Sequence, residues 1–202
     1  MENRERYKRL IMFLAFVPLV LFILVHKFHG KHDVIISLLV LAYSMIPFFM
    51  VFEGRHPQAR EIMVIAVMAA LGVAGRSAFF MIGSFKPIAA IVILTGVSLG
   101  GEAGFLCACL IMMISNMFFG QGPWTPFQMF SWGILGFLAG LLAQPLKKSR
   151  IALALYAVFS GVLYSFLMDV WTVLWADGYF NISRYLAALA SAVPFTAVYA
   201  AS

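Results

Sequence analysis

Two ionisable side chains, Arg76 and Asp169, interrupt long apolar stretches of the sequence. Charged groups are costly in apolar surroundings, so an ionisable residue in such a stretch usually faces a partner or a functional site. Either residue could contact a ligand directly. Because both residues lie at a similar depth in their stretches, we expect them to face each other or to share one polar pocket. The alternative is a buried pair that only fixes helix packing.

A second group of residues surrounds the string GQGPWTP, which contains two glycines and two prolines but no charge. Proline restricts the backbone and glycine permits tight bends, so the string predicts an ordered turn. Trp124 offers a rigid aromatic face, and Asn116, Gln121 and Gln128 offer neutral donors and acceptors. Such a mixture is typical of a small-molecule pocket. The alternative assigns Trp124 and Trp132 to the aromatic belt at a membrane surface.

Catalysis is not expected from the side chains in the apolar stretches. Asp169 is the only carboxylate well inside one of them, and the only histidine is His26, at an edge. A single acid does not provide the acid and base pair that general catalysis needs. The string HKFHGKHD adds His29, His32 and Asp33, which together with His26 could bind a transition metal. We expect no cofactor.

The composition identifies the environment that positions these residues. Of 202 residues, 63% are hydrophobic and 11% are charged, against about a quarter charged in an average globular domain. The alternating pattern of a membrane β-barrel is missing, so the sequence predicts an all-α integral membrane protein. The apolar stretches predict eight spans, at 10–26, 34–52, 60–81, 87–99, 103–119, 127–145, 150–175 and 184–202.

The distribution of lysine and arginine predicts the orientation of these spans. With the N-terminus inside, the inner segments carry nine basic residues and the outer ones four, which agrees with the positive-inside rule. We therefore expect a multi-pass protein of the cell membrane with a cytoplasmic N-terminus. The GQGPWTP connection then faces outward. The net charge of +6 reflects this topology, and no nucleic-acid partner is expected.

Small residues recur along the third predicted span, where Ala66, Ala70 and Ala74 are spaced four residues apart. On a helix this spacing produces a smooth stripe, and such stripes allow membrane helices to approach closely. The stripe predicts a partner helix. Considered alone, the stripe is explained most simply by a partner within the same chain.

The alanine stripe, FKPIAAIVILTGVSLGGEAGF, SNMFFGQGPWTPFQM and GFLAGLL together resemble the substrate-binding S component of energy-coupling factor (ECF) transporters. The resemblance covers about residues 58–202 and implies a six-helix core, with 1–57 as an additional pair of helices. It implies capture of a vitamin from outside and docking, through Ala66, Ala70 and Ala74, on a membrane coupling subunit driven by two ATPase subunits. The chain itself has no Walker A motif.

The resemblance and the polar residues together predict a substrate site on the outer side. Phe85 and Lys86 belong to a connection that commonly covers the site in this family, and Lys86 could attract an anionic cargo. The subgroup resembles cobalamin-type S components, while pantothenate, folate, a metal ion or a scaffold role without transport remain alternatives. The histidines favour no metal site, because metal-importing members chelate from an outer N-terminus. The predicted site residues are Arg76, Phe85, Lys86, Asn116, Gln121, Trp124, Gln128, Asp169, Trp171 and Trp175.

Overall fold

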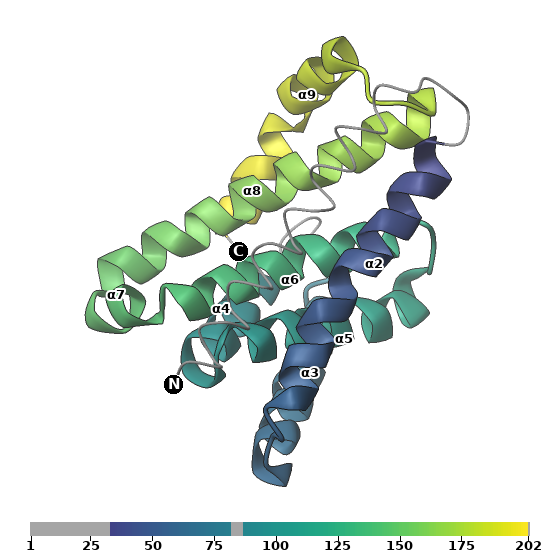
Figure 1. Cartoon of the computed structure of the whole chain (residues 1–202). Coiled ribbons are helices and arrows are strands. Elements are labelled where there is room, and N and C mark those ends of the chain that lie inside the picture. Colours follow the sequence, from purple (N-terminus) through teal and green to yellow (C-terminus); the bar gives the residue numbers. More distant parts are fainter. Residues whose placement is uncertain (1–32, 82–86, 202) are drawn as a thin grey trace.

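The computed structural model describes residues 33–81 and 87–201, and every regular element in these ranges is a helix (Figure 1). The predicted all-α fold is therefore confirmed. The predicted span at 10–26, the histidines of HKFHGKHD, Phe85 and Lys86 lie outside the described residues. The helices are α2 (Asp33–Gly54), α3 (Ala59–Ala78), α4 (Ile88–Leu99), α5 (Gly101–Phe119), α6 (Thr125–Leu141), α7 (Ala143–Lys148), α8 (Arg150–Asp177) and α9 (Ile182–Ala201).

Three of the described helices, α3, α5 and α8, are long and apolar enough to cross a membrane, whereas α4 is apolar but shorter. The predicted span at 127–145 differs in the structure, because α6 ends at Leu141 and the short helix α7 follows. In one continuous helix, the ring of Pro145 would clash with the carbonyl of Leu141. In the first turn of α7, Pro145 needs no partner for a backbone N–H.

Glycines bring the backbones of α4, α5 and α6 into direct contact. A Cβ atom added to Gly104 of α5 would lie 2.7 Å from the Cα atom of Gly96 in α4 and 2.8 Å from the carbonyl oxygen of Gly136 in α6. Any side chain at Gly104 would therefore separate three helices. Close packing of small residues is how membrane helices associate, since lipid provides little hydrophobic drive. These helices form the base on which the site is built.

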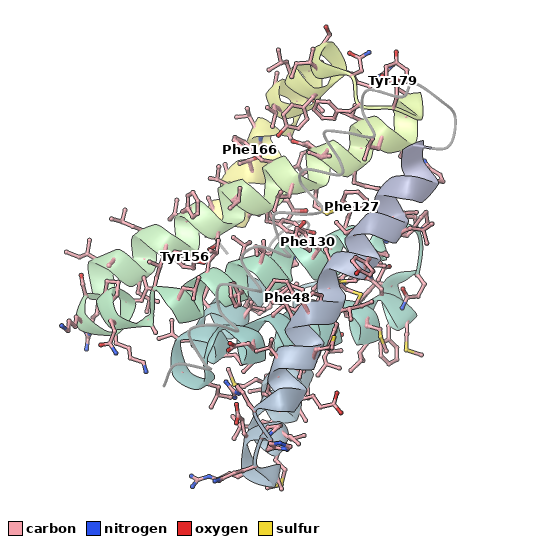
Figure 2. The ribbon with its side chains drawn as sticks, viewed as in Figure 1. Phe48, Phe127, Phe130, Tyr156, Phe166 and Tyr179 are labelled. Carbon is pink, nitrogen blue, oxygen red and sulfur yellow. The ribbon has the colours of Figure 1, made fainter. Side chains whose placement is uncertain are left out.

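Helix α2, which precedes the predicted six-helix core, packs across α5 and α6 (Figure 1). Phe48 is 1% exposed. Its ring stacks on Phe105 at a centroid distance of 4.0 Å and meets the edge of Phe137 at 5.1 Å. Figure 2 shows Phe48 where α2 crosses the other helices. The division into residues 1–57 and 58–202 stays a prediction, but α2 is closely packed on the core.

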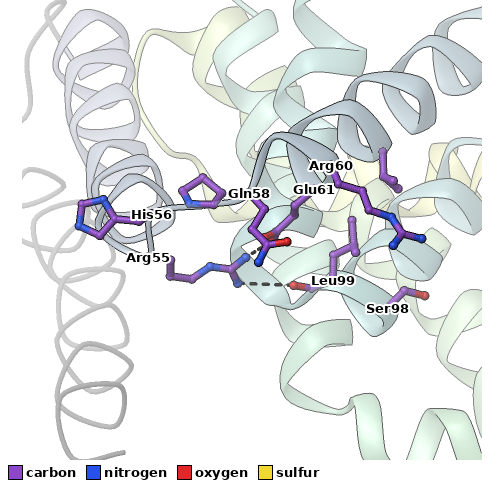
Figure 3. Close-up of a pocket in the computed structure, with 9 residues that line it drawn as sticks. Arg55, His56, Gln58, Arg60, Glu61, Ser98 and Leu99 are labelled. Carbon is purple, nitrogen blue, oxygen red and sulfur yellow. Dashed lines mark hydrogen bonds and ion pairs between the residues drawn. The ribbon is translucent and has the colours of Figure 1, made fainter.

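The segment between α2 and α3 is held to the turn between α4 and α5 by ion pairs. Arg55 pairs with Glu61 and, at 3.6 Å, with Glu102, and it donates a hydrogen bond to the carbonyl of Leu99 at 3.4 Å. Figure 3 shows Arg55 reaching toward Leu99 and Glu61 across an open groove of about 740 Å³. Both segments therefore lie at one end of the bundle, as alternating spans require. Which side of the membrane this end faces stays a prediction.

Candidate substrate-binding site

Arg76 lies near the end of α3, on the face that packs against α5. It is 9% exposed, and its Nη1 atom donates to the Ser115 hydroxyl at 2.6 Å and to the Asn116 side-chain carbonyl at 2.7 Å. The guanidinium also lies over the ring of Phe119, at 5.2 Å from the centroid. Gly72, one turn earlier, packs against Ile111, which keeps α3 close enough to α5 for these bonds.

Asn116 extends the contacts of Arg76 into a network that reaches the GQGPWTP connection. Its Nδ2 atom donates to the Thr125 hydroxyl at 2.9 Å and to the side-chain carbonyl of Gln128 at 2.8 Å. The Thr125 hydroxyl donates to the Gln121 side-chain carbonyl at 2.9 Å, and Gln121 donates to the backbone carbonyl of Met113 at 2.9 Å. Asn116 is fully buried, so its bonds replace those that water would otherwise make.

The connection itself forms the ordered turn that the sequence predicts. Gly120 has a φ of 106°, a value that L residues rarely adopt. The backbone N–H of Thr125 donates to the carbonyl of Gly122 at 2.9 Å, and Pro126 follows in the first turn of α6. The indole of Trp124 covers Gly122 so closely that a side chain there would overlap the ring. Trp124 thus stabilises the turn while remaining partly exposed.

A cavity of about 40 Å³ lies beside this network, and each of six helices contributes to its wall. Arg76 and Gln128 contribute a guanidinium and an amide to it, and Trp132, Tyr164 and Tyr199 contribute aromatic rings that also carry an N–H or a hydroxyl. Trp132 stacks on Tyr164 at 4.3 Å with an interplanar angle of 23°, and Tyr199 meets Tyr164 edge-on at 5.2 Å. A few polar groups beside an aromatic wall can bind a flat ring and fix its orientation. The lining residues are Arg76, Ile88, Met112, Gln128, Trp132, Tyr164 and Tyr199.

The expected pairing of Arg76 with Asp169 is not formed, which corrects the sequence interpretation. No ion pair joins them in the part of the chain that the structure describes, and Asp169 does not line the cavity. Arg76 instead donates hydrogen bonds to the neutral side chains of Ser115 and Asn116. Asp169 is buried, and its Oδ2 atom has no hydrogen-bond partner among the described residues.

The predicted tryptophans do not form one wall with Arg76. Trp171 belongs to a separate cluster, where it contacts Phe127 at 5.2 Å and Trp175 at 5.3 Å. Trp175 is 62% exposed. The network brings together Arg76, Asn116, Gln121 and Gln128, but the cavity lining does not include Trp124, Trp171 or Trp175.

Sequence reasoning missed the aromatic wall of the cavity. The belt interpretation of Trp132 does not hold, because its side chain is buried against Tyr164. Gln128 and Trp132 are four residues apart and therefore share one face of α6, a signal that the sequence carried. Tyr164 and Tyr199 lie far along the chain, and nothing in their spacing shows that they meet.

The predicted alanine stripe faces away from the other described helices. The buried residues of α3 are Ile65, Ala69, Gly72 and Arg76, whereas Ala66, Ala70 and Ala74 are exposed. Within the described ranges, the stripe therefore has no partner helix in this chain.

Comparisons with known proteins agree with this architecture. Residues 57–201 match the family described as ECF-type riboflavin transporter, S component. The chain belongs to this family. It is also 33% identical over 147 residues to the UPF0397 protein VSAL_I1988 of Aliivibrio salmonicida (strain LFI1238), covering 70% of this chain and 77% of that protein. No solved structure matches the chain.

Membership of the family shows what kind of subunit this is. An S component is the substrate-binding subunit of a transporter and not an enzyme, as the sequence predicted. The chain is thus a multi-pass membrane protein that takes a small-molecule substrate and works with ECF membrane and ATPase subunits. The match supports the S component family but not the cobalamin-type subgroup that the sequence analysis proposed.

Proposed function

We propose that this chain captures a vitamin for an ECF importer, and that the vitamin binds at the cavity beside Arg76. The observation that carries the proposal is the convergence of six helices on one small space that is lined by aromatic rings, a guanidinium and an amide. Ligand sites between packed helices commonly have this character. The opening of this site is expected at the end that holds the GQGPWTP turn, the outer end in the predicted orientation.

Riboflavin is the first cargo to test, because the family carries its name. The stacked rings of Trp132 and Tyr164 suit a flat aromatic cargo. Cobalamin, the cargo favoured by the sequence resemblance, and pantothenate and folate are tested beside it. The cavity of about 40 Å³ is far below the roughly 300–1,000 Å³ of a typical ligand pocket. Capture therefore requires helices at the site to separate.

Helix α9 is the best candidate for this movement. It brings Tyr199 to the cavity wall, yet among the described helices its backbone lies close to α8 alone. A displacement of α9 along α8 would enlarge the cavity without disturbing the contacts between α4, α5 and α6. The exposed alanine stripe of α3 lies on another surface, and we propose that it docks on the coupling subunit.

Equilibrium binding of the purified chain in lipid nanodiscs tests the capture role. Riboflavin, cobalamin, pantothenate and folate are titrated against the wild type, Trp132→Leu and the control Trp175→Leu. We expect one vitamin to saturate the wild type and the Trp175 variant, and to bind Trp132→Leu about 2- to 10-fold more weakly, since aromatic contacts add about 0.5–1.5 kcal/mol beyond burial. A folded wild type that binds none of these vitamins would contradict the proposal, as would equal affinities in the two variants.

A further inference from the structure

Arg76 is the single buried basic residue in the described ranges, and no described carboxylate lies within ion-pair distance of it. Its contacts are neutral: a hydroxyl, an amide carbonyl, the Met112 sulfur at 4.0 Å and the ring of Phe119. Hydrogen bonds that a guanidinium donates to neutral groups orient it, but they do not cancel its charge. A buried charge without a counter-charge is costly, and such residues in membrane helices usually serve a function.

The other arginines of the described chain are treated differently. Arg55 contacts two carboxylates, Glu61 and Glu102, and Arg184 contacts Asp177 at 2.6 Å. Arg60 and Arg150 are exposed and can be hydrated. Within the described ranges, the other arginines are thus neutralised or hydrated, whereas no carboxylate pairs with Arg76 at the wall of the cavity.

The guanidinium of Arg76 also keeps part of its donor capacity. Each of its hydrogen bonds to described residues leaves from Nη1. The donors on Nη2 and Nε form the planar fork that binds carboxylate and phosphate groups with two parallel bonds. Asn116 and Ser115 fix Nη1, so the orientation of this fork is set before a ligand arrives.

We propose that Arg76 binds an anionic oxygen group of the cargo, a carboxylate or a phosphate. The proposal rests on the capture function above and narrows it to a substrate class. The cavity agrees in size, because about 40 Å³ exceeds the roughly 10–15 Å³ that one water requires but suits only a small terminal group. The rest of the cargo occupies the space that opens next to the aromatic wall.

Matched ligand pairs that differ only in the anionic group test this proposal. The probes are riboflavin 5′-phosphate against riboflavin, and pantothenate against its alcohol analogue pantothenol. Affinities are measured in nanodiscs for the wild type, Arg76→Gln, Arg76→Lys and the control Arg60→Gln. Gln can still donate to Ser115 and Asn116, and Arg60→Gln removes the same charge from the other end of α3. Binding of the neutral ligand reports that each variant is folded.

In the pair that binds, we expect the wild type to prefer the anionic member by about 10- to 100-fold, the range for a charge-assisted hydrogen bond. Arg76→Gln should reduce this ratio to about 1, Arg76→Lys should keep part of it, and Arg60→Gln should leave it unchanged. Equal binding of both members by the wild type would overturn the proposal and leave vitamin capture standing. A preference that survives Arg76→Gln would also overturn it. Failure of both pairs to bind a folded wild type would overturn the proposal together with capture of these vitamins.

Discussion

Asn116→Leu is the substitution that tests the polar network most directly. The side chain is fully buried, accepts from Arg76 and donates to Thr125 and Gln128. Leu is branched at Cγ, as Asn is, but can make none of these bonds. Arg76 would keep its bond to Ser115, and Gln128 would lose its partner on α5. The substitution therefore removes hydrogen bonds between α5 and both of its neighbours without leaving a large cavity.

The expected loss of stability follows from the type of each bond. A hydrogen bond to a charged group contributes about 1.5–3 kcal/mol. Neutral hydrogen bonds between membrane helices contribute less, about 0.6 kcal/mol on average. One charged and two neutral bonds then give a loss of about 3–4 kcal/mol. Ser115→Ala, which removes one bond to Arg76, should cost about 1.5–3 kcal/mol, and Gln121→Leu at the exposed end of the network about 1 kcal/mol.

Reversible unfolding in mixed detergent micelles, followed by circular dichroism, gives these three differences in the free energy of unfolding. The order Asn116→Leu, then Ser115→Ala, then Gln121→Leu is the specific expectation. A cost below about 1 kcal/mol for Asn116→Leu, less than a single charge-assisted hydrogen bond contributes, would refute the reasoning. If Gln121→Leu cost as much stability as Asn116→Leu, the reasoning would also be refuted, because the bonds at the exposed turn would then contribute as much as the buried ones.

Three further predictions concern the cargo, the additional helix and docking. Asn116→Asp would place a carboxylate beside Arg76, and binding of an anionic cargo should then fall about 100-fold. Like charges about 5 Å apart at an effective dielectric of about 20 repel by roughly 3 kcal/mol. Unchanged affinity for riboflavin 5′-phosphate would contradict this. Phe48→Ala should destabilise the chain by about 3–5 kcal/mol, and preferential proteolysis between α2 and α3 would show that α2 detaches first; uniform proteolysis would argue against this. Ala70→Trp should abolish uptake in cells that supply the ECF partners while leaving cargo binding intact, with the exposed Ile151→Trp as control; equal uptake by both variants would refute docking through α3.

Much of the helical arrangement could be predicted from the sequence. Apolar stretches near the length of a membrane crossing predict helices directly, and the structure has helices at all seven predicted spans that it describes. The division of 127–145 into α6 and α7 was missed, although Pro145 marked it. The contact of α4, α5 and α6 through Gly96, Gly104 and Gly136 could not be predicted, because glycine is common in membrane helices for several reasons.

The candidate site was predicted only where its residues are close in sequence. Asn116, Gln121 and Gln128 lie within one helix-turn-helix segment, so their proximity follows from the turn between them. Partners on distant helices could not be assigned in this way. Arg76 and Asp169 share a similar depth, but depth does not show which face of a helix meets which neighbour, and the rotation of each helix decides the partner.

The geometry of the network also distinguishes two roles that the sequence analysis assigned to one pocket: stabilising the GQGPWTP turn and binding the cargo. Trp124 lies on the turn, outside the cavity lining, whereas Arg76 is part of that lining. Asn116 connects Arg76 to the turn, because it bonds both Arg76 and Thr125. An anion bound at Nη2 and Nε would leave the bonds of Nη1 in place, so cargo can bind without breaking the turn. Loss of Trp124 should then weaken binding only through the turn, less than loss of Trp132, whose ring forms the wall. If Trp124→Ala instead weakened binding more than Trp132→Leu, the cargo would contact the turn itself, and the cavity beside Arg76 would not be the principal site.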